Sequence, residues 1–251
     1  MNIYIPAIIR PGTWLQLPDP EISREVEQML YNMEDKVAEA SITLSLFEAA
    51  NSSSSIESND DQEKVREIRK EVRELVKQEF GDQYHQDYDR YSLECDLRIL
   101  RRKTELGIVP RSYKHKVPFI HAHSFIYAVD SFGKFLDAIC SYPNLPGAVT
   151  TLKDKFYTDL PTIRKIRNSA LHIEDRSRGY GSPRERDRGI RMQTNGFLGL
   201  SNLEGSHLCY TIDDGTYQRV SISSDTLGTM VEILNQLLSS FEWEGPPRVS
   251  P

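Results

Sequence analysis

The sequence predicts a mainly α-helical bundle with a small antiparallel β-sheet just before the last helix. Apolar residues recur every three or four positions through most of the 251-residue chain, which is the spacing of helices that bury one face. Between residues 196 and 222 this spacing gives way to short runs rich in β-branched and aromatic residues, which indicate strands. We expect these elements to form one domain over residues 1–251.

Composition indicates a globular protein in a reducing compartment. The chain is 38% hydrophobic and 27% charged, as expected for a packed core under an ordinary surface. Cys95, Cys140 and Cys209 are widely spaced and form no C-x-x-C motif, so we expect reduced thiols rather than disulfides. Residues 1–10 lack the charged segment that begins a signal peptide, and no run approaches the length of a membrane span. We therefore expect a cytoplasmic protein without a membrane partner.

The net charge of −6 hides an uneven distribution. Residues 1–97 hold 21 acidic and 10 basic residues. Residues 98–116 hold seven basic residues and one acid, and residues 164–191 hold nine basic residues and four acids. Because phosphate contacts depend on local patches, the acidic total does not exclude a nucleic-acid partner.

The chain begins with an extended arm and a long helix. Residues 1–20 contain four prolines, which favour an extended or turning path over the bundle. Asp19 is a good N-cap and Pro20 a good first residue for a helix whose apolar spacing continues to about Asn51. The serine-rich residues 52–61 predict a flexible loop.

A second helix should run from about residue 61 to Phe80. Glutamates alternate with basic residues at its other positions, which is typical of a solvated face. After Gly81 the helical spacing resumes through Leu100, either as a kinked continuation or as a separate helix. Pro110 then ends the pattern.

Seven Lys and Arg residues and one histidine flank this end of the helical pattern. They form either a charged helix end with a solvated loop or a surface that contacts phosphates. They are Arg98, Arg101, Arg102 and Lys103 at the helix end, and Arg111, Lys114, His115 and Lys116 in the loop.

Pro118 is expected to start a helix that is apolar on most of its faces. Such a helix lies in the centre of a bundle, or serves both the core and a dimer contact. His121 and His123 lie two residues apart and hence on opposite sides of it, so we interpret them as packing residues rather than as joint metal ligands.

The next helix, from about residue 148 to residue 175, carries the main candidate site. Pro161 interrupts it and should kink or restart it. Beyond the proline, Arg164, Asn168 and His172 follow each other at i, i+4 and form a polar stripe beside the apolar one. The simplest interpretation is a solvated helix end whose cations interact favourably with the helix dipole.

The remaining segments complete the fold. Residues 177–195 are rich in Arg, Gly and Ser and predict a mobile loop, either simply solvated or able to stack on bases and pair with phosphates. Strands are expected at 196–200, 207–212 and 216–222, the last two joined by an Asp-Asp-Gly turn. Ser224 or Asp225 should cap the last helix, and residues 242–251 should form a frayed tail.

Arg167-Asn168-x-x-x-His172 resembles the R-x(4–6)-H motif of the HEPN superfamily (higher eukaryotes and prokaryotes nucleotide-binding). Members of that superfamily are helical bundles, and many are metal-independent ribonucleases that act as dimers. The resemblance covers residues 118–241 in organisation, where the motif follows a long amphipathic helix and precedes a hairpin and a final helix.

The resemblance implies a role for each residue near the motif. His172 would be the general acid or base, Arg167 the phosphate clamp, and Asn168 would orient His172 or bind a phosphate oxygen. Arg164, Lys165 and Arg176 would contact the RNA backbone. The implied activity needs no cofactor and no metal.

The implied chemistry is attack by the 2′-hydroxyl of RNA on the adjacent phosphorus, which leaves a 2′,3′-cyclic phosphate. Histidine suits the proton transfers at neutral pH, and arginine offers a permanently charged fork to the phosphate. We expect Arg167 and His172 to be exposed at a cleft, because they would supply little core packing.

One histidine and one arginine are few groups for this reaction, so we expect a homodimer with the polar stripe near its two-fold axis. A neutralising protein partner would fit a toxin or phage-defence component. Two alternatives to the enzyme are a non-catalytic RNA- or nucleotide-binding module and a dimeric protein-interaction bundle.

Overall fold

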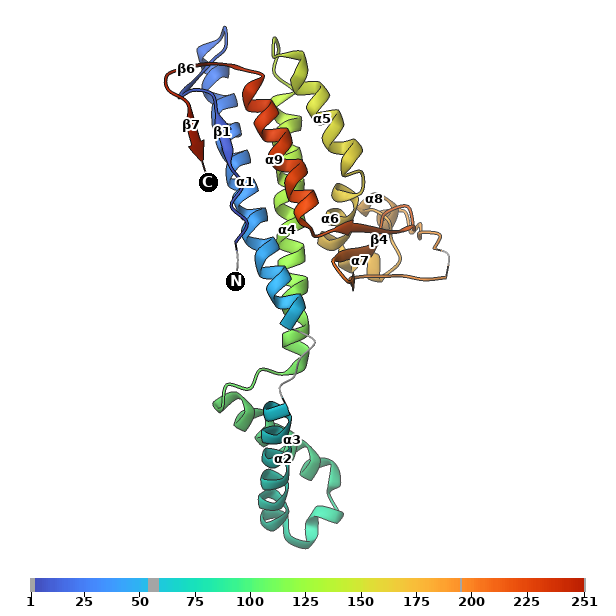
Figure 1. The fold of residues 1–251 in the computed structure, drawn as a ribbon. Coiled ribbons are helices and arrows are strands. Elements are labelled where there is room, and N and C mark those ends of the chain that lie inside the picture. The colour runs from blue at the N-terminus through green and yellow to red at the C-terminus, as the bar shows by residue number, and fades with distance from the viewer. Residues whose placement is uncertain (1–2, 54–58, 195, 251) are drawn as a thin grey trace. The chain divides into compact units, whose positions relative to one another are not determined.

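The computed structural model describes residues 3–53, 59–194 and 196–250. The predicted fold class is confirmed, since the chain is mainly helical and carries a small antiparallel sheet before its last long helix (Figure 1). None of the helices in the described ranges combines the length and apolarity that a membrane span requires. Cys95, Cys140 and Cys209 are free thiols, as expected.

The chain divides into two compact units, whereas the sequence analysis expected one domain. The bundle unit comprises residues 1–49 and 118–251, and the charged unit comprises residues 50–117. Each unit has its own apolar cluster. The division arises because the helices of the charged unit bury their apolar faces against each other, around Ile68, Val72, Val76, Cys95 and Ile99.

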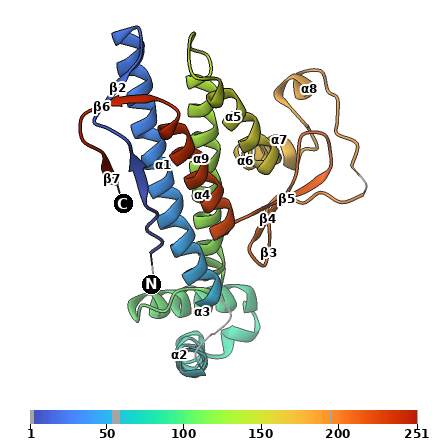
Figure 2. The ribbon, with the colours of Figure 1, turned by 45° about the horizontal axis from the view of Figure 1, so that its top comes forward.

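Four long helices form the bundle unit, to which α1 and α4 contribute the parts that lie within it. They are α1 (Pro20–Ser53), α4 (Arg111–Ile139), α5 (Gly147–Asp159) and α9 (Ser224–Ser239), which lie side by side in both views (Figure 2). Their apolar faces meet in a core that includes Phe125, Phe132 and Leu237, each fully buried. α5 packs directly on α9.

The caps of the long helices follow the predicted chemistry. Asp19 accepts a hydrogen bond from the backbone N–H of Glu21 at 2.8 Å, which confirms it as the cap of α1. α9 is capped by Ser223, whose hydroxyl accepts from the Thr226 N–H. The cap of α9 therefore lies one residue before the position that we expected.

The arm and the tail pair with each other. β1 (Ile8–Arg10) is antiparallel to β7 (Arg248–Ser250), and β2 (Trp14–Gln16) is antiparallel to β6 (Glu242–Glu244). The prediction of a frayed tail is therefore wrong. Trp243 helps to hold the tail, because it packs on the core and its Nε1 donates to the Leu238 carbonyl at 2.7 Å.

The predicted start of the central helix at Pro118 is also wrong. α4 begins at Arg111, directly after Pro110, and contains Pro118 as a buried interior residue. A single interior proline removes only one backbone donor, which this helix tolerates. The basic residues Lys114, His115 and Lys116 consequently lie on a helix rather than in a loop.

The charged unit contains a pair of helices. α2 (Asn59–Phe80) is followed by a 3-10 turn (Gly81–His85) and by α3 (Tyr88–Glu105), so the second half of this segment is a separate helix. Part of the predicted loop, residues 54–58, lies outside the described residues, and the rest of residues 52–61 belongs to the ends of α1 and α2.

The small sheet lies between the motif region and α9. β3 (Asn202–Glu204), β4 (His207–Thr211) and β5 (Tyr217–Ser221) form an antiparallel sheet in that order. The first strand lies at 202–204 rather than at 196–200. Within 196–200, Gly199 nevertheless lies against Thr211, whose backbone N–H donates to the Gly199 carbonyl at 2.7 Å.

The segment 177–195, which was expected to be a loop without regular structure, includes a short helix. α8 (Pro183–Asp187) begins after Ser182, whose hydroxyl accepts from the Glu185 N–H at 3.2 Å. A serine cap followed by proline at the first helical position is a standard helix start.

Candidate functional site

The motif helix is broken twice. α5 ends at Asp159, before the predicted interruption at Pro161, and α6 (Ile163–Leu171) then carries the motif arginine. The second break was not predicted: His172 separates α6 from α7 (Ile173–Ser177) with φ −108° and ψ 42°. His172 therefore caps the C-terminus of α6 and the N-terminus of α7.

Arg167 is fixed by a buried carboxylate on α4. Its Nε donates to Asp130 Oδ2 at 2.7 Å, and its Nη2 lies 2.6 Å from the same oxygen. The Asp130 side chain is only 2% exposed and that of Arg167 only 11%. Arg167 is thus less exposed than the sequence analysis expected, because burying Asp130 requires a cation beside it.

Arg164 joins the same carboxylate and extends the network to a second acid. Its Nε donates to Asp130 Oδ1 at 3.3 Å, and its Nη2 donates to Asp137 Oδ2 at 2.8 Å. The Tyr157 hydroxyl accepts from Arg164 and donates to Asp137 at 2.8 Å. Lys134 on α4 lies 3.2 Å from Asp130 Oδ2. The ion-pair network therefore consists of Asp130, Lys134, Asp137, Tyr157, Arg164 and Arg167.

The pKa values within this network follow from burial and charge. Burial raises the pKa of Tyr157 far above its ordinary value, and the hydrogen bond to Asp137 adds to the rise. Burial alone would lower the pKa of Arg164, but Asp137 and Asp130 raise it overall. At neutral pH the Tyr157 hydroxyl therefore keeps its proton and Arg164 keeps its positive charge.

Tyr127 lies next to the arginine side of the network. Burial raises its pKa, and the positive charge of Arg167 opposes that rise. One turn earlier on α4, His123 Nε2 lies 2.7 Å from the hydroxyl of Tyr210 on β4. This contact with the buried Tyr210 agrees with the packing role predicted for His123. His121 is half-buried, and burial lowers its pKa.

His172 is accessible and lies outside the ion-pair network. Its side chain is 44% exposed, and its Nδ1 lies 3.8 Å from Glu174 Oε1. Its backbone is held on both sides: the N–H donates to the Asn168 carbonyl at 3.0 Å, and the carbonyl accepts from the Arg176 N–H at 3.0 Å. The imidazole is therefore presented from a fixed backbone position on a partly exposed side chain.

His172, Glu174 and Asp175 could in principle offer ligand atoms to a metal ion. Their ligand atoms lie within 4.8 Å of one another. Asp175, however, is fully buried and already accepts hydrogen bonds from Arg178 at 2.7 Å and from Arg186 at 3.2 Å. Two cations on the central carboxylate disfavour a third, so we assign no metal to these residues.

The other predicted site residues are placed differently. Lys165 is 50% exposed and lies 3.5 Å from Asp214 in the turn between β4 and β5. Asn168 is half-buried and makes no side-chain hydrogen bond within the described ranges, so the contact with His172 implied by the resemblance is not formed.

Arg176, for which the resemblance implies a contact with the RNA backbone, is buried in this structure. It is 3% exposed, its Nε donates to Ser169 Oγ at 3.2 Å, and its Nη1 donates to the Tyr180 carbonyl at 2.8 Å. Burial lowers its pKa. Arg176 is therefore a structural residue that ties α7 to α6 and to the segment that follows.

Sequence reasoning missed the acids that organise the site. Asp130 lies within a run of buried residues on α4 that includes Ile126 and Leu136. A carboxylate in such a run is a usable signal, because a buried charge requires a partner. Asp137 and Tyr157 gave no comparable signal, since both occur at ordinary polar positions of their helices.

No protein family, no curated protein and no solved structure matches this chain.

Proposed function

We propose that this chain is a metal-independent endoribonuclease of the HEPN type that leaves 2′,3′-cyclic phosphate ends. One observation carries the proposal: an accessible histidine stands five residues after an arginine that a buried carboxylate holds in place. The exposure and the contacts of His172 and Arg167 thus differ as their proposed roles require. The histidine is open to a substrate, and the arginine is rigidly oriented.

Arg167 retains a donor for the substrate. Its Nε and Nη2 bind Asp130, and Nη1 forms no hydrogen bond with any described residue. Nη1 is also not among the fully buried polar atoms that lack a partner. An arginine whose orientation is set through one edge of its guanidinium can offer the other edge to a phosphoryl oxygen without reorganisation.

His172 would move the protons of the reaction. The 2′-oxygen forms a bond to phosphorus while its proton passes to an imidazole nitrogen, and the bond from phosphorus to the 5′-oxygen breaks. The departing 5′-oxygen takes a proton, so the products are a cyclic phosphate and a 5′-hydroxyl. Arg164, which is 38% exposed, and Lys165 would contact neighbouring phosphates.

A homodimer remains part of the proposal, because a single histidine cannot be both the base and the acid of one concerted step. The His172 of a second copy would supply the other proton transfer. The apolar surface of α4 no longer supports dimerisation, since its residues from Phe125 to Ile139 are largely buried within one chain. Light scattering at micromolar concentration tests the dimer.

The biological setting is proposed on indirect grounds. A ribonuclease of this type suits a toxin or phage-defence component, with a neutralising protein as its partner. Three free thiols favour a reducing compartment, so we place the protein in the cytoplasm. No cofactor enters the proposed reaction.

The direct test is incubation of purified protein with end-labelled RNA in EDTA, followed by analysis of the product ends. We expect cleavage with 2′,3′-cyclic phosphate and 5′-hydroxyl ends, and binding without cleavage for DNA of the same sequence. Cleavage that stops in EDTA and returns with a divalent metal would contradict the proposal and direct attention to His172, Glu174 and Asp175.

The second candidate is a non-catalytic RNA-binding module. It is favoured by the low exposure of Arg167 and by the neutralisation of its charge by Asp130. The same incubation separates the two functions, because a binding module retains the RNA intact. A dimeric protein-interaction bundle would neither bind nor cut it.

A further inference from the structure

The helix α2 of the charged unit has three distinct faces. At 100° per residue, Ile68, Val72 and Val76 lie on one face, and they are the buried residues of this helix. The acids Glu63, Glu67, Glu71 and Glu74 share a second face. Basic side chains occupy a third, with Arg66, Arg69 and Arg73 at i, i+3 and i+7.

This separation of charge differs from the alternating, solvated face expected from the sequence. Arg69 and Arg73 are i, i+4 neighbours of like charge, as are Glu63 and Glu67. Like charges at this spacing destabilise an isolated helix. Arg66, Arg69 and Arg73 thus form one positive stripe along α2 despite the like-charge neighbours within it.

The stripe lines a groove within the charged unit. One hollow of about 380 Å³ is lined by Arg66 and Arg69 from α2, Lys103 from α3, and Arg111 and Lys114 from the start of α4. A second hollow of about 440 Å³ shares Arg69, Lys103 and Pro110 with the first and adds Arg73. The two hollows are thus continuous, and we call them together the basic groove.

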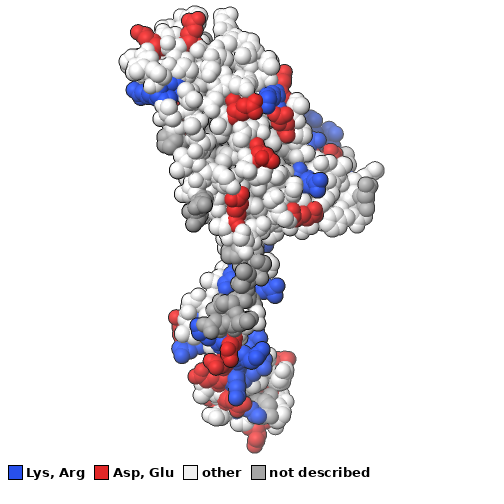
Figure 3. Space-filling view, viewed as in Figure 1, with Lys and Arg blue, Asp and Glu red and all other residues white. Residues whose placement is uncertain are grey.

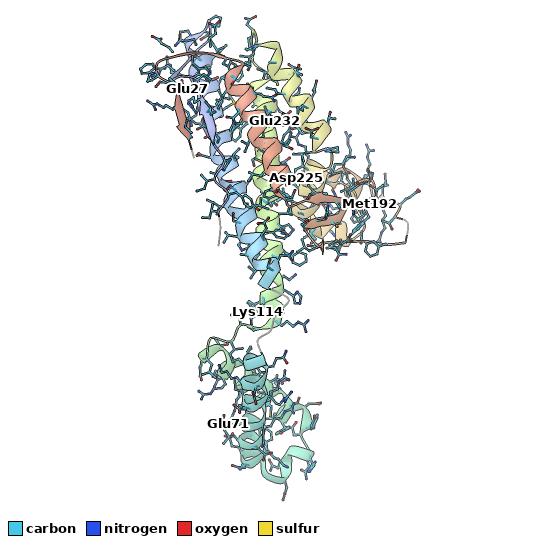
Figure 4. All side chains as sticks on the ribbon, viewed as in Figure 1. Glu27, Glu71, Lys114, Met192, Asp225 and Glu232 are labelled. Atoms are coloured by element: carbon cyan, nitrogen blue, oxygen red, sulfur yellow. The ribbon has the colours of Figure 1, made fainter. Side chains whose placement is uncertain are left out.

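Among the residues whose side chains the structure describes, six cations and a single acid, Asp96, line the basic groove. Figure 3 shows Lys and Arg side chains gathered over this unit, whereas those on the visible face of the bundle unit are scattered. Figure 4 labels Lys114 and also Glu71, which belongs to the acidic face of α2 and does not line the groove.

Two cations of the same unit that lie outside the groove are paired with acids. Arg98 is held by Glu79 at 2.6 Å and by Glu94 at 2.7 Å, and Arg102 lies 3.3 Å from Glu105. In contrast, the groove residues from α2 and α3, together with Arg111, make no ion pair with another residue in the described part of the chain. Their positive charge is therefore available to a ligand.

The arrangement suits a chain of phosphates rather than a single anion. Arg66 and Arg73 are separated by seven residues, which is a rise of about 10 Å along α2. One strand of a nucleic-acid duplex carries a phosphate about every 3.4 Å of axis, so about three phosphates fit along this stripe. Four of the six cations are arginines, whose planar fork matches phosphate oxygens.

We propose that the basic groove of the charged unit binds the phosphodiester backbone of a nucleic acid. The apolar residues between the cations, Val65, Ile108 and Val109, offer contact to sugars without reading base edges. Binding should consequently depend strongly on salt and weakly on sequence. The groove residues belong to the charged unit and the motif of α6 belongs to the bundle unit, so this inference does not depend on whether His172 cleaves RNA.

The test uses the full chain and a fluorescent 20-nucleotide RNA with 2′-O-methyl groups, which cannot be cleaved by 2′-hydroxyl attack. The groove variant is Arg69→Ala/Lys103→Ala, and the control Arg90→Ala/Arg102→Ala removes the same charge from the same unit outside the groove. We expect the groove variant to bind about tenfold or more weakly. Its dependence on salt should fall by about one to two units in slope, because two phosphate contacts are lost. The control should bind like the wild type.

Two further arms identify the ligand class. DNA of the same sequence should bind with similar salt dependence, because the contacts are to phosphates. Poly-glutamate at equal charge concentration should compete poorly, and equal competition would overturn the proposal in favour of an acidic protein partner. Wild-type affinity in the groove variant, equal weakening in the control, or no nucleic-acid binding at 50 mM salt would also overturn it. Circular dichroism of each variant excludes unfolding as the cause.

Failure of this inference and failure of the proposed enzyme are distinguishable. A protein that binds the modified RNA through the groove but leaves ordinary RNA intact supports the groove and rejects the ribonuclease.

Discussion

Arg167 on α6 and Asp130 on α4 form a buried ion pair, with Nη2 of the arginine 2.6 Å from Oδ2 of the aspartate. The pair links α6, which carries the motif arginine, to α4, the central helix of the bundle unit. Any change that disturbs the carboxylate should therefore affect both folding and the orientation of the arginine.

Replacing Asp130 by Asn should lower the free energy of unfolding by about 1–3 kcal/mol, because it leaves charged donors of Arg167 and Arg164 poorly satisfied in a buried site. Urea denaturation measures the change. The control is Lys134→Ala, since Lys134 lies 3.2 Å from the same carboxylate but is 52% exposed. That variant should lose less than about 1 kcal/mol. Equal losses in the two variants would show that the buried pair has no special role.

Arg176→Ala should destabilise the protein without a specific loss of RNA affinity. The substitution removes the donors to Ser169 and Tyr180 inside a closed site, which should cost about 1–3 kcal/mol. Arg188 is exposed in the same region and provides the control, with an expected change within about 0.5 kcal/mol. If folded Arg176→Ala binds RNA far more weakly than Arg188→Ala does, the side chain contacts RNA after all.

Acid should weaken the fold through His121. Burial lowers the pKa of this histidine in the folded state, so the unfolded chain binds its proton more readily. The stability that the neutral ring provides is fully present above the unfolded pKa of about 6.5 and is lost as the pH falls through the lower folded value. His121→Gln should flatten the dependence of Tm on pH just below 6.5. An unchanged slope in that range would contradict this assignment.

Much of the fold could be predicted because local chemistry decides it. The apolar spacing of α1, its Asp19 cap, the break at Pro161 and the Asp213-Asp214-Gly215 turn each depend on a few neighbouring residues. The tail was mispredicted because its structure depends on residues far away in sequence, since Ile9 pairs with Val249. No pattern among neighbouring residues predicts a partner so far away in sequence.

The burial of charged side chains explains most of the remaining differences between the predicted and the observed structure. Arg10 in the arm is 2% exposed, pairs with Glu34 at 2.5 Å and stacks on Tyr31. Nothing near Arg10 in sequence distinguishes it from a surface arginine. Arg176 was likewise assigned to RNA contact, although the fold surrounds it. The position of a cation on a helix is readable from sequence, but its neighbours are set by tertiary packing.

The different surroundings of Arg167 and His172 could also not be predicted from neighbouring residues in the sequence. A continuous helix would extend the polar stripe through His172. Instead, α6 ends just before that residue and α7 begins just after it. The break leaves the imidazole exposed while Arg167 points to α4. The two residues therefore share a motif but have different surroundings.

The central claim is that Arg167 and His172 together cleave RNA without a metal. The most direct measurement is the cleavage rate of labelled RNA in EDTA for His172→Ala and Arg167→Lys, compared with Leu171→Ala, an exposed neighbour on α6. Loss of a general acid–base should lower the rate by about 10²–10⁴-fold. Arg167→Lys keeps the charge but loses the second edge of the fork, and should lower the rate by about 10²-fold or more. The account predicts that both variants lose activity while remaining folded, and that Leu171→Ala cleaves normally. Tm should be nearly unchanged in His172→Ala and lowered in Arg167→Lys, which loses donors to the buried Asp130. Wild-type rates in both His172→Ala and Arg167→Lys would contradict it.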